Sequence, residues 1–449
     1  MILHQIVLLI TILYTVSGIL GFLFLKLIKI DSMLPATFMV SLPLYIIMGF
    51  SLLLSILTIL GLLTIGPSTF LFLVFLTILL VAFLLKKRRA HILINGRTSL
   101  TYIFKHCFLN TENIVPLILY VATFIFFIDK INRMQWPPVG DVLSLHGPLI
   151  SLFLFNGRLT PTLQPLVPWI LYYPPGFHVL AANIASWFNI FPGEAALLLG
   201  GSATILIFWL IYSLTYIYSN SKLLSTAVLL SPFVYHPSGH LSRWIIGFLY
   251  NGTYPSLVAI LLSMFSITML ATIDKTEITL FNYPLRVTLV LLSIMFTLLV
   301  EYPPYLPLIL IELIYLVLKY RGTYHKYASS LLKNDAYFLT KNNKKITIIL
   351  VILLVTSICL INDYCGISDY LAILSSRFYT YYFLLPSSRA TFLRKISFSY
   401  FYDHITGLAM MIAFVISLLF ILAKKYTNLS FTYFICFILL LLSQLIHLY

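Results

Sequence analysis

The stretch AALLLGGSATILIFWLIYSLTYIY, residues 195–218, contains no charged side chain and decides the class of fold. A helix of about 20 such residues crosses the roughly 30 Å of hydrocarbon in a bilayer. Similar apolar runs recur along the whole chain, and hydrophobic residues make up 61% of its 449 residues. The runs lack the polar and apolar alternation of membrane β-barrel strands. The sequence therefore predicts an all-α polytopic membrane protein.

About 12 transmembrane helices are predicted, together with short re-entrant or interfacial helices. The predicted spans are 2–25, 39–64, 69–85, 114–130, 195–218, 222–235, 253–273, 284–300, 303–318, 346–362, 405–423 and 428–448. Three segments, 176–191, 222–235 and 371–386, are short for a crossing. We expect 176–191 to be a re-entrant or interfacial helix. In the alternative topology it crosses the membrane and 222–235 does not.

The positions of the basic residues, which give the chain a net charge of +15, predict the orientation of these helices. Only 9% of the residues are charged, and the basic ones form short clusters between apolar runs. Because basic clusters stay in the cytoplasm, the loop that begins at Lys86-Lys87-Arg88-Arg89 is placed inside, with most other basic residues. No soluble basic domain exists that could hold nucleic acid. The four cysteines form no CxxC pair, which argues against zinc or redox chemistry.

The chain divides into three regions. Residues 1–113 hold the N-terminal helices and a basic cytoplasmic loop. Residues 114–320 form the core region, with a first outer loop at 129–178. Residues 321–449 hold the C-terminal helices, with a second outer loop at 363–404.

Candidate functional residues gather on the outer side. The first outer loop contains Asp141, His146, Arg158, Tyr173 and His178. A carboxylate beside an apolar wall has a raised pKa and can act as a general base, so Asp141 is the candidate base. The structural alternatives are that Asp141 caps a helix in the loop and that both histidines only support the fold.

Further candidates lie in other outer segments. Arg389, Arg394 and Lys395 can bind a phosphate, or they anchor an amphipathic segment at the lipid headgroups. Glu194 and Glu301 lie in tight outer turns, where Glu301 either caps the next helix or lines the substrate cavity. A base together with phosphate-binding cations suits the transfer of a group from a lipid phosphate to a hydroxyl.

Three segments of the first outer loop carry a resemblance to a known superfamily. They are residues 140–147 (GDVLSLHG), 156–161 (NGRLTP) and 173–178 (YPPGFH). Together they resemble the first outer loop of the GT-C glycosyltransferases, and most closely the prokaryotic, especially archaeal, members that use polyprenyl-phosphate-linked sugars. The resemblance implies that Asp141 is the catalytic base and that residues 129–178 roof the donor cavity.

The sequence thus predicts an inverting membrane glycosyltransferase, with its active site on the extracytoplasmic side of the cell membrane. His146 is expected either to orient Asp141 or to donate a hydrogen bond to the sugar. Tyr173, His178, Arg158, Glu301 and the second-loop cations are the expected substrate-binding residues. The expected partners are a polyprenyl-phosphate-linked sugar, membrane lipids, and a protein, lipid or glycan acceptor. No cofactor is expected, and Asp141 has no paired acid that would indicate a divalent metal.

Two other functions remain open at the level of sequence. A transporter or flippase for lipid-linked or polar solutes would explain Glu312, a carboxylate inside the predicted 303–318 helix. A non-catalytic partner in glycan assembly would need only the GT-C-like fold, and Asp141 would then be dispensable.

Overall fold

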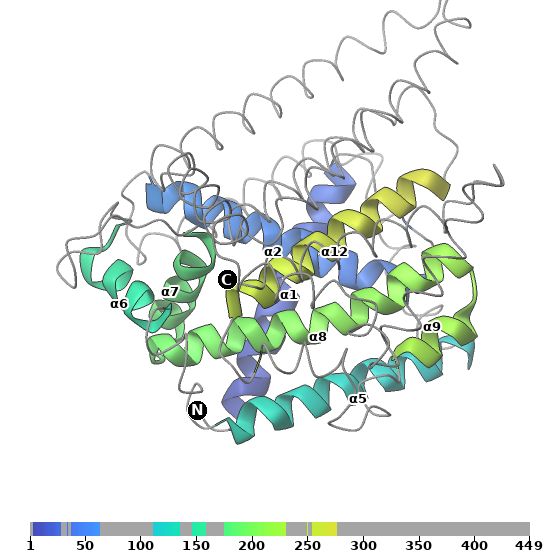
Figure 1. The fold of residues 1–449 in the computed structure, drawn as a ribbon, viewed down its shortest axis with the longest axis horizontal. Coiled ribbons are helices and arrows are strands. Elements are labelled where there is room, and N and C mark those ends of the chain that lie inside the picture. Colours follow the sequence, from blue (N-terminus) through green and yellow to red (C-terminus); the bar gives the residue numbers. More distant parts are fainter. Residues whose placement is uncertain are drawn as a thin grey trace, which may run out of the picture.

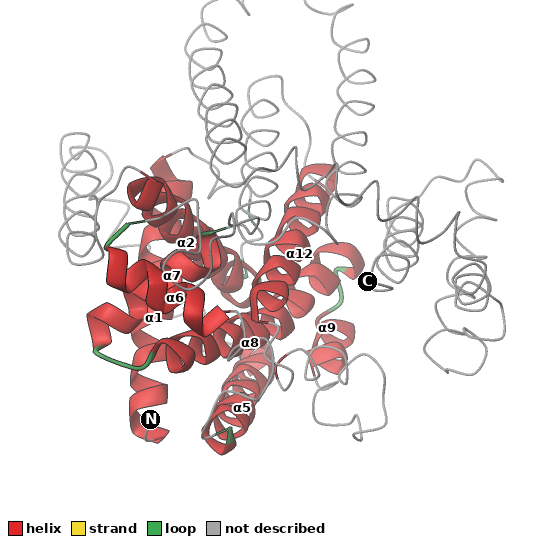
Figure 2. Cartoon of the chain, turned by 60° about the vertical axis from the view of Figure 1, so that its left-hand side comes forward, coloured by secondary structure: helices red, strands yellow, loops and turns green. Residues whose placement is uncertain are grey.

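The protein is described by a computed structural model that places residues 3–27, 34, 37–62, 111–134, 146–158, 175–229, 249 and 254–275. All regular secondary structure within these residues is helical (Figure 1, Figure 2). The helices are α1 (Leu3–Leu27), α2 (Phe38–Leu62), α5 (Thr111–Arg133), α6 (Gly147–Asn156), α7 (Gly176–Phe188), α8 (Pro192–Ser219), α9 (Lys222–Leu229) and α12 (Tyr254–Lys275).

Four of these helices are long and apolar enough to cross a membrane. Their apolar stretches are Leu3–Leu25, Phe38–Thr58, Ile114–Arg133 and Pro192–Ile217. The prediction of a helical membrane protein is therefore confirmed for the part of the chain that the structure describes. The predicted spans 69–85, 284–300, 303–318, 346–362, 405–423 and 428–448, and the short segment 371–386, lie outside the described residues.

α8 is the central helix of the described bundle. It packs against α12, α9, α2, α5 and α7, and Figure 1 shows it running between α5 and α12. A small residue on α8 lets α12 approach closely. A Cβ added at Gly200 would lie 2.5 Å from the Tyr254 ring, so a larger side chain would not fit there. A helix that is apolar on all sides is expected in such an enclosed position.

α1 and α2 form an antiparallel pair in which the two backbones touch. A Cβ added at Gly21 would lie 1.9 Å from the backbone oxygen of Tyr45, and one added at Gly49 would lie 1.7 Å from that of Ser17. No side chain fits at either position. Glycine at such a crossing allows the close approach that drives helix association in membranes.

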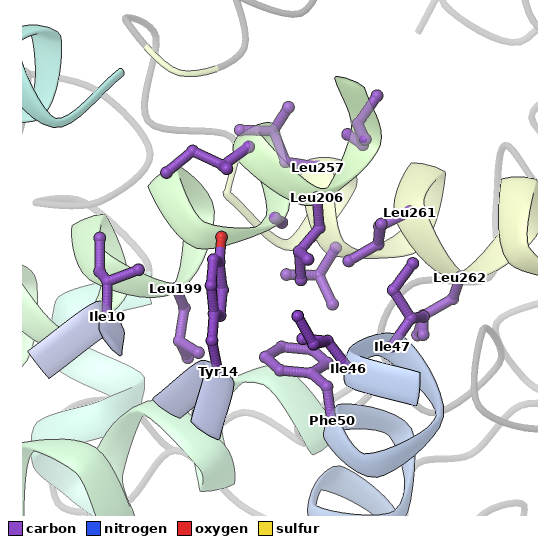
Figure 3. Packing of buried hydrophobic residues seen from close by; sticks show 14 of the residues in the cluster. Ile10, Tyr14, Ile46, Ile47, Phe50, Leu199, Leu206, Leu257, Leu261 and Leu262 are labelled. Carbon is purple, nitrogen blue, oxygen red and sulfur yellow. The ribbon is translucent and has the colours of Figure 1, made fainter. Parts of the chain in front are cut away.

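Tyrosine hydroxyls connect the helices in the buried interior. Tyr120 on α5 donates to the backbone oxygens of Met39 (2.8 Å) and Trp209 (3.1 Å), on α2 and α8. Its ring stacks on Trp209 at 4.8 Å between centroids. Tyr14 on α1 donates to the Ser202 oxygen of α8 at 2.7 Å and lies among the apolar side chains of Figure 3. Each hydroxyl thus finds an acceptor without water, as an apolar environment requires.

One face of α5 remains uncovered. Tyr120, Phe127 and Ile131 are buried, whereas large aliphatic side chains are exposed on the opposite face. The exposed residues are Ile114, Val115, Ile118, Val121 and Ile125. A continuous stripe of this kind is uncommon on a soluble monomer and suits contact with lipid.

α6 and α7 are two short helices that pack against each other. α7 also contacts α2 and α8, and every residue from Gly176 to Ala185 is buried. With 13 residues, α7 rises about 20 Å, which is less than the roughly 30 Å of a bilayer core. Whether residues 176–191 are re-entrant or interfacial stays a prediction from the sequence.

Candidate functional site

The structure describes three of the predicted site residues, namely His146, Arg158 and His178. The others lie outside the described residues, as does Glu312. These others are Asp141, Tyr173, Glu301, Arg389, Arg394 and Lys395.

His146 lies at the start of α6. It is the N-cap residue, with Gly147 and Pro148 following it, and only 3% of its surface is exposed. Proline is favoured in the first turn of a helix because its missing N–H has no partner there in any case. The local sequence therefore begins a helix directly after His146 and holds its backbone in place.

His178 lies in the first turn of α7. The helix follows Pro175, whose backbone oxygen accepts a hydrogen bond of 2.9 Å from the Val179 N–H. His178 is 4% exposed, so its imidazole is enclosed like the rest of this helix.

The two histidines form a buried pair. Nδ1 of His146 lies 3.1 Å from Nε2 of His178, and the ring centroids are 5.2 Å apart. The Phe177 ring packs edge-on against both imidazoles, at centroid distances of 6.0 Å and 5.5 Å. The starts of α6 and α7, which are separated by a long connection in the sequence, therefore meet at this contact.

Burial determines the protonation state of His146. Loss of solvent lowers the pKa of His146 to about 4, because an imidazolium is poorly stabilised away from water. Its position at a helix N-terminus also disfavours a cation. At neutral pH His146 is thus a neutral imidazole, with one nitrogen donating a hydrogen bond and the other accepting one.

Arg158 lies at the other end of α6. Gly157 ends the helix in the left-handed conformation, with φ of 63°, and its N–H donates to the Phe153 oxygen at 2.9 Å. Because ten helical residues rise about 15 Å, exposed Arg158 is well separated from the histidine pair. The structure does not bring these three residues into one cluster.

Two acids near the predicted outer side have structural contacts. The Phe191 N–H donates to Oε2 of Glu194 at 3.1 Å, which stabilises the first turn of α8. Asp129 forms an ion pair of 2.9 Å with Arg133, one turn later on α5. Among the described residues, no three histidine, cysteine or acidic side chains lie close enough together to hold a metal ion.

Sequence reasoning offered a helix in the first outer loop only as an alternative role for Asp141, and it predicted neither α6 nor the contact between the histidines. The largely apolar run of residues 149–155 after a His-Gly-Pro start was the available signal for α6. No signal in a single sequence predicted that two histidines 32 positions apart would touch.

Comparisons of the chain with protein family models, with curated proteins and with solved structures found no match.

Proposed function

We propose that this chain is a GT-C-like glycosyltransferase of the cell membrane. In this proposal about 12 helices span the bilayer, and the active site faces the extracytoplasmic side. A polyprenyl-phosphate-linked sugar enters laterally from the lipid. The sugar passes to a hydroxyl of a protein, lipid or glycan acceptor.

The contact between His146 and His178 is the observation that carries the proposal. These residues belong to segments 140–147 and 173–178, the first and the last of the three segments that carry the GT-C resemblance. In the fold, Nδ1 of His146 lies within hydrogen-bond distance of Nε2 of His178, at 3.1 Å. Segments that build one site must meet in the structure, whereas chance matches in unrelated parts of a loop have no reason to do so.

The chemistry proposed is a single in-line displacement. The Asp141 carboxylate takes the proton of the acceptor hydroxyl, whose oxygen bonds to the anomeric carbon of the sugar. The bond from that carbon to the phosphate oxygen breaks, and polyprenyl phosphate leaves with the electron pair. Attack on the face opposite the leaving group inverts the anomeric configuration. No strong general acid is needed, because phosphate is a stable anion.

The phosphate is assigned to the cations of the second outer loop. Arg389 and Arg394 can each donate two parallel hydrogen bonds to phosphate oxygens, and Lys395 adds a point charge. This assignment rests on the residue types and on their predicted outer position in the sequence.

The test is the glycan profile of a strain that lacks this chain, complemented with wild type, Asp141→Asn or Asp129→Asn. Asp129 is the matched control, since it is a partly exposed acid that pairs with Arg133. We expect wild type and Asp129→Asn to restore a missing sugar and Asp141→Asn to fail. Restoration by Asp141→Asn would remove that residue from the chemistry. An unaltered profile in the deletion strain would contradict transferase activity and favour transport involving Glu312.

A further inference from the structure

The exposed aliphatic face of α5, at the edge of the described bundle in Figure 1, leads into charged residues at one end of the helix. Ile118, Val121 and Ile125 are half exposed or more. Asp129 and Arg133 follow Ile125 at intervals of four residues, which keeps them on the same face. From Ile118 to Asp129 the helix rises about 16 Å, close to the roughly 15 Å of hydrocarbon in one leaflet. A lipid chain can therefore lie along this aliphatic stripe while its headgroup reaches the charged end.

Asp129 orients the guanidinium of Arg133. Nε of Arg133 lies 2.9 Å from Oδ2 of Asp129, and the two side chains are 72% and 46% exposed, respectively. Because Nε makes this contact, the edge of the guanidinium between its two terminal nitrogens can still donate two parallel hydrogen bonds. Planar, paired donors of this kind match the oxygens of a phosphate group.

Lys130 adds a second cation beside the aliphatic stripe. It precedes Arg133 by three residues, so the two side chains are neighbours on the helix surface. Its Nζ lies 5.3 Å from the centre of the Phe126 ring, and this cation–π contact keeps the ammonium close to the apolar part of the helix. The stem of such a lysine lies on apolar surface while its charge stays at the polar boundary. Both cations thus lie where the headgroup of a lipid on the stripe would be.

The charges at this end of α5 select the kind of headgroup. Asp129, Lys130 and Arg133 together carry a net charge of +1. A phosphate diester without any other charged group carries one negative charge and balances it. The headgroup of phosphatidylcholine also contains a quaternary ammonium, which would be repelled by Lys130 and Arg133.

We propose that the Asp129 end of α5 binds an anionic phospholipid. The phosphate accepts hydrogen bonds from the terminal nitrogens of Arg133 and lies beside the Lys130 ammonium. One acyl chain lies along Ile118, Val121 and Ile125. This binding goes beyond the proposed glycosyl transfer and does not depend on it.

The lipid beside the stripe can be identified in the full chain with a local fluorescent reporter. Val121→Cys is introduced into a chain whose four cysteines are replaced by serine, and it is labelled with bimane. Vesicles contain equal amounts of phosphatidylglycerol and phosphatidylcholine, and bromine on the acyl chains of one of them quenches the reporter on contact. We expect phosphatidylglycerol to be enriched roughly fivefold over phosphatidylcholine at the reporter. Equal quenching by the two lipids would overturn the proposal. Quenching by neither would also overturn it, because protein would then cover the stripe.

Charge variants locate this preference at the end of α5. Replacing Lys130→Gln and Arg133→Gln together leaves only the charge of Asp129, so we expect the enrichment of phosphatidylglycerol to disappear. Arg158→Gln is the matched control, because it removes one exposed positive charge from the end of α6. The control should keep the enrichment. Enrichment that persists in the double variant, or that is lost in the control, would overturn the assignment to this site.

Two further comparisons distinguish the proposed contact from simpler ones. Arg133→Lys keeps the charge without the paired donors, so its enrichment should fall between those of wild type and the double variant. Enrichment as in wild type would overturn the paired hydrogen bonds. An excess of sodium phosphate should reduce the enrichment no more than sodium chloride of equal ionic strength does. A larger effect of phosphate would show that the free anion occupies the site, which would overturn the lipid assignment.

Discussion

At the scale of single residues, burial of His146 makes the free energy of unfolding depend on pH. The pKa is about 4 in the folded protein and near 6.5 in the unfolded chain. Above pH 6.5 neither state binds the proton, and the folded state has its full stability. Between pH 6.5 and 4 only the unfolded chain binds it, so stability falls as the pH falls, by roughly 3 kcal/mol in all.

This linkage gives a prediction for His146→Asn. Lowering the pH from 7.5 to 5 removes about 2 kcal/mol of stability through this group in wild type, and the variant lacks that contribution. Denaturant unfolding of the detergent-solubilised protein at the two pH values measures the difference. Equal losses of stability in wild type and variant would contradict the assignment to His146.

Tyr120 provides a second prediction at this scale. Its hydroxyl donates to backbone oxygens on two other helices, Met39 of α2 and Trp209 of α8. Tyr120→Phe keeps the ring stacking and removes the donor, so we expect a loss of about 1 kcal/mol in the free energy of unfolding. Tyr216→Phe, at a partly buried position on α8, is the control and should change stability less. An equal effect of the two substitutions would show that the bridging hydroxyl is unimportant.

At the scale of elements, the α1–α2 crossing depends on two glycines. Gly49→Ala places a methyl group against the Ser17 backbone oxygen, so the helices must separate. We expect a loss of about 1–3 kcal/mol, as in other overpacked interiors. Gly18→Ala is the control, because its Cβ would lie 3.5 Å from the Ile46 side chain, an ordinary contact. The free energies of unfolding of Gly49→Ala and Gly18→Ala are compared in detergent. Equal values would contradict a close backbone crossing.

The long helices and α7, which lies within the predicted helix 176–191, could be predicted from sequence, whereas α6 and its contact with α7 could not. In lipid, an uncharged run such as residues 195–218 is stable as a helix, because a helix forms its backbone hydrogen bonds internally. The bounds of α8, Pro192–Ser219, agree closely with this run. α6 was missed because ten residues give a weak periodic signal inside a segment rich in proline. The pairing of His146 with His178 depends on how α6 and α7 dock. Docking is a tertiary property that hydropathy does not encode.

At the scale of the whole molecule, the exposed aliphatic face of α5 and the four candidate spans define how the described bundle meets lipid. Ile118 and Ile125 are 58% and 61% exposed, although they lie within one of those spans. An apolar surface of this size is stable when lipid covers it. Lipid is therefore the solvent that suits this face, and the positive-inside rule predicts its orientation.

The orientation gives a prediction about access to the two ends of this bundle. Ser186 follows the buried part of α7 and Ser219 ends α8, and both are exposed. In a chain whose four cysteines are replaced by serine, Ser186→Cys should react with a membrane-impermeant maleimide applied to intact cells. Ser219→Cys should react only after the cells are permeabilised. The reverse pattern would invert the topology and place the histidine pair on the cytoplasmic side.

The enclosure of α7 has a consequence for biosynthesis. Its neighbours include α2, which leaves the ribosome before it, and α8, which leaves just after it. A helix of about 20 Å does not anchor itself across a bilayer. A nascent chain that stops at α7 therefore lacks α8, one of the helices against which α7 packs. α7 gains this contact only when α8 inserts. The order of translation thus sets the moment at which the segment bearing His178 becomes enclosed by its neighbouring helices.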